Sequence, residues 1–369
     1  MNKISNSLLA KLSSCLCPPG NGVYTVNTAK ERKEKLHQHI YGTVYFADER
    51  WQTSLNELAS TPHAVILGIA SDCGGGILRG ANWGPLFLRS TLLQDYPDLN
   101  LFDLGDIRVI PHLLHDKYLN EATIVNCQKA LYNSSGVTYP VSPLTITEDV
   151  LKDFYAEFPN KGVFGIGGDH SVSYPLVKTY LQAKKQQGIR AAVIHFDAHT
   201  DLLHERLGID LCFGSWCTHI LDDLNAPSDL IQIGIRSSGK PKQHWENTFG
   251  VKQHWAKEIK QVGVEAITNQ IIQQLTNDGV DELYVSFDID AIDEKFASAT
   301  GTPEPDGLYP DEVMIILRTL TKSFKITGAD MMELAPFTDS TGKGQGSCEQ
   351  TLAIAAEISA FLITKISEK

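Results

Sequence analysis

Three short segments of the chain concentrate carboxylate and imidazole side chains. Residues 165–171 end in Asp-His-Ser, residues 195–201 read His-Phe-Asp-Ala-His-Thr-Asp, and residues 286–293 read Ser-Phe-Asp-Ile-Asp-Ala-Ile-Asp. Each segment directly follows or continues an apolar run, a pattern typical of the end of a buried strand. Side chains of this kind at strand ends can bind metal ions or transfer protons, so these segments are the candidate site.

The charged residues alternate within two of these segments. Every second side chain of an extended chain points to the same side. If strand geometry persists beyond the apolar run, Asp197, His199 and Asp201 converge. By the same spacing Asp288 aligns with Asp290. Crowded carboxylates are costly to remove from water unless cations neutralise them, so the spacing predicts a metal site.

The candidate ligands are hard oxygen and nitrogen donors. They comprise four aspartates and two histidines: His170, Asp197, His199, Asp201, Asp288 and Asp290. This set suits Mn²⁺, with Ni²⁺, Co²⁺, Fe²⁺ and Zn²⁺ less favoured. Six ligands that share one carboxylate can hold two ions about 3.5 Å apart, which acidify the water between them. One Asp-x-His pair is commonly a turn or cap, but three such clusters after three apolar runs indicate a metal centre.

Apolar runs alternate with helical stretches from residue 63 onward. The predicted strands are 64–70, 101–107, 162–166, 191–196, 230–235, 283–287 and 326–333, and the predicted helices include 85–93, 174–187, 267–277, 310–320 and 348–366. Continuous apolar runs are typical of parallel strands covered on both faces. The alternation predicts an α/β fold with a doubly wound parallel sheet, whose ligands bind beyond the carboxyl ends of the strands.

Residues 1–60 differ in composition from the remainder of the chain. They are rich in Lys, Glu, Gln and His, contain Pro-Pro-Gly at 18–20, and end in a predicted helix over 49–58. Apolar residues at 4, 8, 12 and 16 have the spacing of one helical face. We interpret residues 1–60 as an N-terminal extension outside the sheet, to which the sequence assigns no role. Residues 61–369 form one catalytic domain in this interpretation.

Composition restricts the class of protein. The chain has 369 residues, 42% apolar and 21% charged, with 32 basic against 44 acidic side chains and a formal net charge of −12. This content excludes disorder of the whole chain. The sequence contains no run of about 18 uncharged apolar residues, so it does not predict a membrane span. An acidic surface disfavours nucleic acid and anionic lipid as partners.

Seven scattered cysteines do not form a disulfide framework, and the first twenty residues are too polar for an export signal. We expect a cytoplasmic protein.

The motifs resemble the signature blocks of the ureohydrolases, the family of arginase, agmatinase, guanidinobutyrase and formiminoglutamase. Besides the three segments above, the matching blocks are 72–89, 103–106, 234–237, 299–307 and 330–336, in family order. The resemblance implies an arginase-like three-layer α/β/α fold that assembles into trimers or hexamers. It also implies that two manganese ions share the aspartates 197 and 288 as bridging ligands. One ion would be held by His170, Asp197, Asp201 and Asp288, and the other by Asp197, His199, Asp288 and Asp290.

The resemblance further implies the hydrolysis of a small cationic guanidino compound. An agmatine-, guanidinobutyrate-, guanidine- or arginine-like substrate would give urea and an amine through attack by a metal-bridging hydroxide. Asp201 would hydrogen-bond the hydroxide and pass its proton to the leaving amine. Glu333 would orient the guanidinium, and the hydroxyl of Thr302 would fix the substrate or a ligand.

Part of the expected pattern is missing. Arginases and agmatinases usually carry a His-Gly pair shortly after the Asp-Ala-His-Thr-Asp block, and that histidine shuttles protons, whereas this chain has Phe213-Gly214. His204 and His219 lie on the same segment and are candidate replacements, although ordinary loop or helix roles suit both. Phe213 and Trp216 indicate a tight apolar pocket, which argues against free arginine. The Gly-rich stretch 73–80 lacks the signatures of nucleotide-binding loops.

Three alternatives remain open. A formiminoglutamase-type hydrolase would release formamide instead of urea. A zinc deacetylase of similar fold needs a single ion, and Asp290 and the His170 block argue against it. A non-catalytic binding protein would keep the fold without turnover. The six intact ligand positions argue against this alternative.

Overall fold

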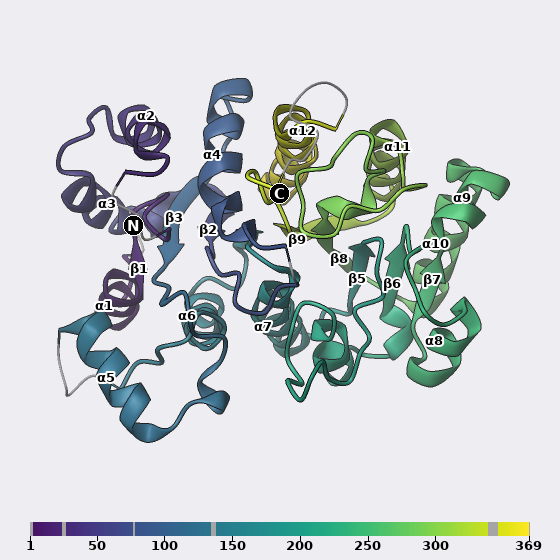
Figure 1. Ribbon diagram of the computed structural model, residues 1–369, viewed down its shortest axis with the longest axis horizontal. Helices are drawn as coiled ribbons and strands as arrows, with labels where there is room; N and C mark the ends of the chain where they lie inside the picture. The colour runs from purple at the N-terminus through teal and green to yellow at the C-terminus, as the bar shows by residue number, and fades with distance from the viewer. Residues whose placement is uncertain (1–2, 24–26, 77, 134–137, 339–345, 369) are drawn as a thin grey trace.

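The computed structural model describes residues 3–23, 27–76, 78–133, 138–338 and 346–368, which form one central sheet with helices on both sides (Figure 1). The strands of this sheet are β1 (Leu16–Cys17), β2 (Ala64–Gly68), β3 (Phe102–Ile107), β4 (Gly162–Ile166), β5 (Ala191–Phe196), β6 (Leu230–Ile233), β7 (Lys252–His254), β8 (Glu282–Asp288) and β9 (Lys325–Met332). Their order across the sheet is β1-β3-β2-β4-β9-β8-β5-β6-β7. Only the β1–β3 pair is antiparallel among the paired strands of the described residues. The predicted doubly wound, three-layer α/β/α fold is confirmed.

Helices cover the two faces of the sheet. The α-helices are α1 (Asn6–Cys15), α2 (Lys30–Tyr41), α3 (Ala47–Leu55), α4 (Gly84–Asp95), α5 (Glu121–Tyr132), α6 (Pro143–Glu157), α7 (Ser173–Gln186), α8 (Lys242–Phe249), α9 (Ala256–Val262), α10 (Val264–Asp278), α11 (Pro310–Leu320) and α12 (Cys348–Ser367). Figure 1 shows α4, α12 and α11 along one side of the sheet and α6 and α7 along the other. This arrangement leaves the ends of the central strands free to carry a site.

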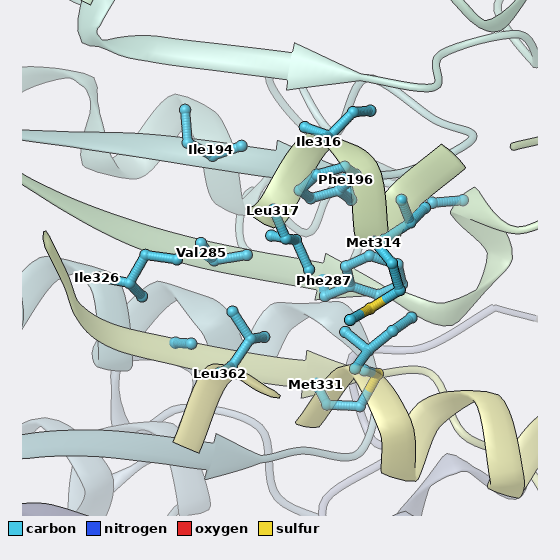
Figure 2. Close-up of a cluster of buried hydrophobic side chains, with 14 of the residues drawn as sticks. Ile194, Phe196, Val285, Phe287, Met314, Ile316, Leu317, Ile326, Met331 and Leu362 are labelled. Carbon is cyan, nitrogen blue, oxygen red and sulfur yellow. The ribbon is translucent and has the colours of Figure 1, made fainter. Parts of the chain in front are cut away.

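Alternate residues of each strand enter different cores. In β5, Ala192, Ile194 and Phe196 belong to the core that α4, α10, α11 and α12 cover, whereas Ala191 and Val193 belong to the core on the side of α1, α6 and α7. Figure 2 shows the first core, where side chains of β5, β8 and β9 meet those of α11 and α12. Both faces of the sheet are therefore buried, which explains why the strands are continuous apolar runs.

Local sequence explains where the helices begin and which face they bury. In α11, Pro310 occupies the first turn, where its missing N–H costs nothing, and the Glu312 carboxylate accepts the backbone N–H of Tyr309 at 2.8 Å. Val313, Leu317 and Leu320 recur at helical spacing and are buried. The burial of this stripe fixes α11 against the sheet.

The predicted strands all occur, within two residues of their expected bounds. Two further strands, β1 and β7, were not predicted. Both are short, and β7 reads Lys-Gln-His, because an edge strand needs no continuous apolar run. The predicted helices also occur, including α3 at 47–55 in place of 49–58.

The expectation that the first sixty residues lie outside the sheet is wrong. Leu16 and Cys17 form β1, which pairs with Ile107 and Asp106 of β3. The Asp106 carboxylate accepts the backbone N–H groups of Gly20 and Gly22, both at 2.9 Å. Trp51 is buried and donates its indole N–H to Leu104 O at 2.9 Å. The overall polar composition concealed these contacts, although the apolar residues at 4, 8, 12 and 16 are buried in the core.

The last helix, α12, is the one described helix with the length and apolar content that a membrane span requires. It carries Glu349, Glu357 and Lys365, and 61% of its most apolar window is buried. It packs on β9, β4 and α4. These are the properties of a core helix.

Candidate metal centre and active site

The three chemically active segments meet at one edge of the sheet. His170 follows β4, Asp197 follows β5, and Asp288 ends β8, while Glu333 follows β9. These four strands are neighbours in the order β4-β9-β8-β5. Parallel strands bring their carboxyl ends together, so residues far apart in the chain become one cluster.

The first set of groups surrounds the His170 imidazole. His170 Nδ1 lies 3.1 Å from Asp197 Oδ2, 3.2 Å from Asp201 Oδ2 and 3.1 Å from Asp288 Oδ2. This nitrogen is buried and makes no hydrogen bond to a described group. A buried nitrogen without a hydrogen bond, facing three carboxylate oxygens, fits a divalent cation.

The second set lies on the other side of Asp197. His199 Nδ1 lies 3.1 Å from Asp290 Oδ2 and 3.4 Å from Asp197 Oδ1. Asp197 therefore presents one carboxylate oxygen to each imidazole. For Asp288, Oδ2 faces His170 and Oδ1 accepts the backbone N–H of Asp290 at 2.8 Å. Two adjacent ligand sets that share a carboxylate fit two metal ions.

Turns, and not a continued strand, bring these side chains together. The strand β5 ends at Phe196, and Asp201 adopts the left-handed conformation with φ of +49°. The Asp197 carboxylate accepts the N–H of His199 at 2.6 Å, as in an Asx turn. The prediction of convergence holds, but the predicted extended geometry is wrong. Glu333 also has a positive φ, +61°, and such conformations cost about 1–2 kcal/mol in a non-glycine residue.

A buried network fixes the orientation of His170. Its Nε2 donates to Ser286 Oγ at 3.1 Å, because that hydroxyl donates its own proton to Asp330 Oδ1 at 2.9 Å. Tyr284 and Ser173 donate to the other oxygen of Asp330, at 2.8 and 3.1 Å. With the proton on Nε2, Nδ1 keeps its lone pair for a cation.

His195 acts on Asp197 through a second network, which the sequence interpretation missed. Gln232 Nε2 donates to His195 Nδ1 at 2.9 Å, so His195 carries its proton on Nε2 and donates to Asp197 Oδ2 at 2.9 Å. Gln253 Nε2 donates in turn to Gln232 Oε1 at 2.8 Å. The three residues are paired across β5, β6 and β7, and the register is the signal that identifies them.

Trp216 is a further functional residue whose role was not predicted. Its indole Nε1 donates to Asp201 Oδ2 at 2.8 Å, and its side chain is fully buried. The loop that follows Asp201 therefore folds back, so that Trp216 contacts the Asp201 carboxylate. Among the predicted residues, Thr302 Oγ1 donates to Asp290 Oδ2 at 2.9 Å. Glu333 Oε1 accepts the backbone N–H of His170 at 2.9 Å.

The two candidate replacements for the proton-shuttle histidine lie elsewhere. His204 is exposed, and its ring lies 5.4 Å from that of Phe249. His219 Nε2 contacts Asp210 O at 2.9 Å. Phe213 donates its N–H to Gly74 O at 3.0 Å and lines a cavity beside the centre. No described contact joins His204 or His219 to the carboxylate cluster.

Burial shapes the electrostatics of the centre. Burial and the Asp197 carboxylate raise the pKa of Asp201, and burial and Asp290 raise the pKa of Asp288. Burial likewise raises the pKa of Glu333, with Asp288 adding to the effect. Crowding therefore makes full ionisation unfavourable without added positive charge. Since His199 has 26% of its side chain exposed and the other ligands at most about 5%, the centre opens to solvent beside His199.

Comparison with known proteins places the fold and the motifs in one family. The arginase family model matches residues 62–364. Mitochondrial agmatinase of Gallus gallus is 29% identical over 297 residues, 76% of each chain. Mitochondrial guanidino acid hydrolase of Homo sapiens is 27% identical over 76% of this chain and 73% of its own length. The solved structure of proclavaminate amidinohydrolase from Streptomyces clavuligerus has a TM-score of 0.62 and 27% identity, covering 83% of this chain and 92% of its own.

The match includes all three chemically active segments and ends within the last helix. The cluster of histidines and aspartates in the structure agrees with the binuclear metal centre of that family. The protein thus belongs to the arginase family, as a hydrolase of the ureohydrolase type.

Proposed function

We propose that this protein hydrolyses a small cationic guanidino compound to urea and an amine, using two Mn²⁺ ions, with Ni²⁺ as the second candidate. The observation that carries the proposal is the position of Asp197, whose two oxygens face His170 and His199 separately. The names of the relatives, agmatinase and guanidino acid hydrolase, support a guanidino substrate.

The proposed ligands follow from the two sets of contacts, except that the place of Asp288 in the second set follows from the family resemblance. His170, Asp197, Asp201 and Asp288 would hold one ion, and Asp197, His199, Asp288 and Asp290 the other. When bound, such a pair of ions acidifies a water molecule and supplies hydroxide near neutral pH. The carboxylates and imidazoles would hold this pair in place, oriented by the hydrogen bond from His170 to Ser286 and by that from His195 to Asp197.

The remaining groups act on the substrate and on protons. Asp201 would take up a proton from the attacking water and pass it to the leaving amine, since its carboxylate belongs to the His170 set. Glu333 is buried and would orient the guanidinium through a charge-assisted hydrogen bond. Thr302 would hold Asp290 in position. His204 stays a prediction from the sequence that its observed contact with Phe249 does not support.

A urea-release assay tests this function. The metal-free protein is loaded with Mn²⁺ or Ni²⁺ and incubated with agmatine, 4-guanidinobutyrate, guanidine, arginine and formiminoglutamate. We expect urea from at least one guanidino compound and none from the Asp197→Ala variant. Formamide from formiminoglutamate, with no urea from any guanidino compound, would favour the formimino alternative and contradict the proposal.

The cytoplasmic location and the assembly into trimers or hexamers also stay predictions. Light scattering of the purified protein measures the assembly directly. A mass of three or six times 40.7 kDa is expected, and a monomer at working concentration would contradict it.

A further inference from the structure

A cavity of about 560 Å³ lies against the two loops that flank the metal centre. One wall is the glycine-rich segment 74–76, in which the Gly74 N–H donates to Asp169 Oδ2 at 3.0 Å, one residue before His170. A Cβ on Gly74 would collide with the Ser171 hydroxyl, so this wall lies directly against the His170 segment. The opposite wall is the loop that begins after Asp201 and closes at Trp216. The cavity therefore adjoins the two loops that flank the ligands, whereas none of the six candidate ligands is among its described lining residues.

The charge of this cavity is opposite to that of the chain. Its described lining residues include Arg79, Arg206, His112 and His115 but no carboxylate, although the chain carries a net −12. Arg79 is partly neutralised, because its guanidinium contacts Asp72 O and lies 3.8 Å from Asp72 Oδ1. Lys117, just outside, pairs with Asp210 at 2.7 Å.

The imidazole of His115 contributes little fixed charge. The pKa of His115 is lowered by burial and by Lys117, and its Nδ1 accepts the N–H of Lys117 at 3.1 Å. His112 is exposed at the cavity wall. Arg206 forms no ion pair with any carboxylate in the described part of the chain. Arg206 is thus the one arginine of the described lining that has no carboxylate partner.

The position of Arg206 is determined by a tight hairpin and an aromatic ring. Its backbone N–H donates to Ile209 O at 2.8 Å and its carbonyl accepts the Ile209 N–H at 3.1 Å. Leu207 and Gly208 between them have positive φ values of +53° and +85°. The guanidinium lies 4.9 Å from the centroid of the Phe213 ring. Phe213, which stands where a proton-shuttle histidine is expected, therefore supports a cation at the cavity wall.

We propose that this cavity binds the distal carboxylate of an ω-guanidino acid, with Arg206 as the residue that determines this specificity. The proposal rests on the proposed function and names its substrate class. A guanidinium binds a carboxylate through two parallel hydrogen bonds. An ammonium-ended substrate such as agmatine would meet a like charge at the same place.

The reaction for a representative substrate balances without a further reactant. In 4-guanidinobutyrate, the bond between the guanidino carbon and the chain nitrogen breaks, and a bond from that carbon to the water oxygen forms. Both protons of the water go to the leaving nitrogen, which departs as an ammonium group and carries away the positive charge of the guanidinium. The products are urea and 4-aminobutyrate.

A matched pair of substrates tests the proposal. Agmatine and 4-guanidinobutyrate share the guanidino group and a similar chain but end in opposite charges. We expect kcat/KM for 4-guanidinobutyrate to exceed that for agmatine at least tenfold. In Arg206→Glu the KM for 4-guanidinobutyrate should rise about ten- to hundredfold, the loss expected for a charge-assisted contact, and the preference for the acid should disappear. Arg206→Lys, which keeps the charge but loses the planar fork, should fall between the two.

Arg318→Glu is the control. Arg318 is an exposed arginine of α11 whose guanidinium lies 5.9 Å from the Phe361 ring, outside the cavity. The same change of charge there should leave the substrate preference as it is. Metal content and urea unfolding confirm that each variant is folded and loaded.

The outcomes separate this inference from the proposed function. Faster urea release from agmatine or guanidine than from the acid would overturn the inference and leave the function intact. An unchanged preference in Arg206→Glu would also overturn it. No urea from any guanidino compound, with both metals loaded, would overturn both.

Discussion

Replacing Trp216 with Phe removes one hydrogen bond from the metal centre and little else. The indole N–H donates to Asp201 Oδ2 at 2.8 Å, and the same oxygen lies 3.2 Å from His170 Nδ1. Phenylalanine keeps an aromatic ring beside His170 and His195, whose ring centroids lie 5.0 and 5.1 Å away. The buried carboxylate then lacks its donor. A hydrogen bond to a charged group contributes about 1.5–3 kcal/mol, which corresponds to roughly ten- to hundredfold in affinity.

The loss should be confined to one of the two ions, because Asp201 belongs to the His170 set only. Titration calorimetry of Mn²⁺ into the metal-free variant should therefore show one weakened and one nearly unchanged binding step. Trp245→Phe is the matched control, since its indole donates to the neutral hydroxyl of Ser238 at 2.9 Å. Equal losses in both variants would attribute the effect to general loosening of the fold. Parent-like binding of both ions by Trp216→Phe would refute the role of this hydrogen bond.

Three further predictions concern other parts of the molecule. Asp197→Ala removes the carboxylate shared by both sets, so metal analysis should find neither ion tightly bound and the urea assay no activity; two retained ions would contradict the shared-ligand geometry. Burial and Lys242 lower the pKa of His254 to about 4, so the folded protein disfavours its protonation. Stability should therefore be full above about pH 6.5 and fall by about 2 kcal/mol between pH 7 and 5, as worked from the two pKa values. In His254→Gln urea unfolding should show a correspondingly smaller loss over that range, and an identical pH dependence would exclude this histidine as the cause. Trp51→Ala leaves a large cavity under the N-terminal helices and should destabilise the protein by about 3–5 kcal/mol; an unchanged urea midpoint would show that this side chain does not anchor the N-terminal segment.

The strands were predictable to the extent that both of their faces are buried. The runs 162–166 and 191–196 contain the residues of two cores and match β4 and β5 residue for residue. The edge strand β1 is only two residues long and the edge strand β7 reads Lys-Gln-His, so periodicity does not identify them. The attachment of the N-terminal segment was missed because the polar composition of residues 1–60 outweighed the apolar stripe that the core buries, and the backbone N–H groups that bind Asp106 carry no signal in residue type.

The candidate ligands were predictable because their types are unusual at the ends of apolar strands. Their partners were not, since Gln232 and Trp216 are ordinary residues until the fold brings them to His195 and Asp201. Strand register supplies the first contact, and loop closure supplies the second. The turn at Asp201 also lay beyond prediction, because a positive φ in an aspartate is not encoded by residue type alone.

The metal content of the reconstituted protein tests the central claim most directly. Metal-free protein is dialysed against Mn²⁺, freed of loosely bound ions, and measured by elemental analysis together with the protein concentration. Two ions per chain are expected, held by the two sets that meet at Asp197. One ion per chain, or none, in folded protein would contradict it.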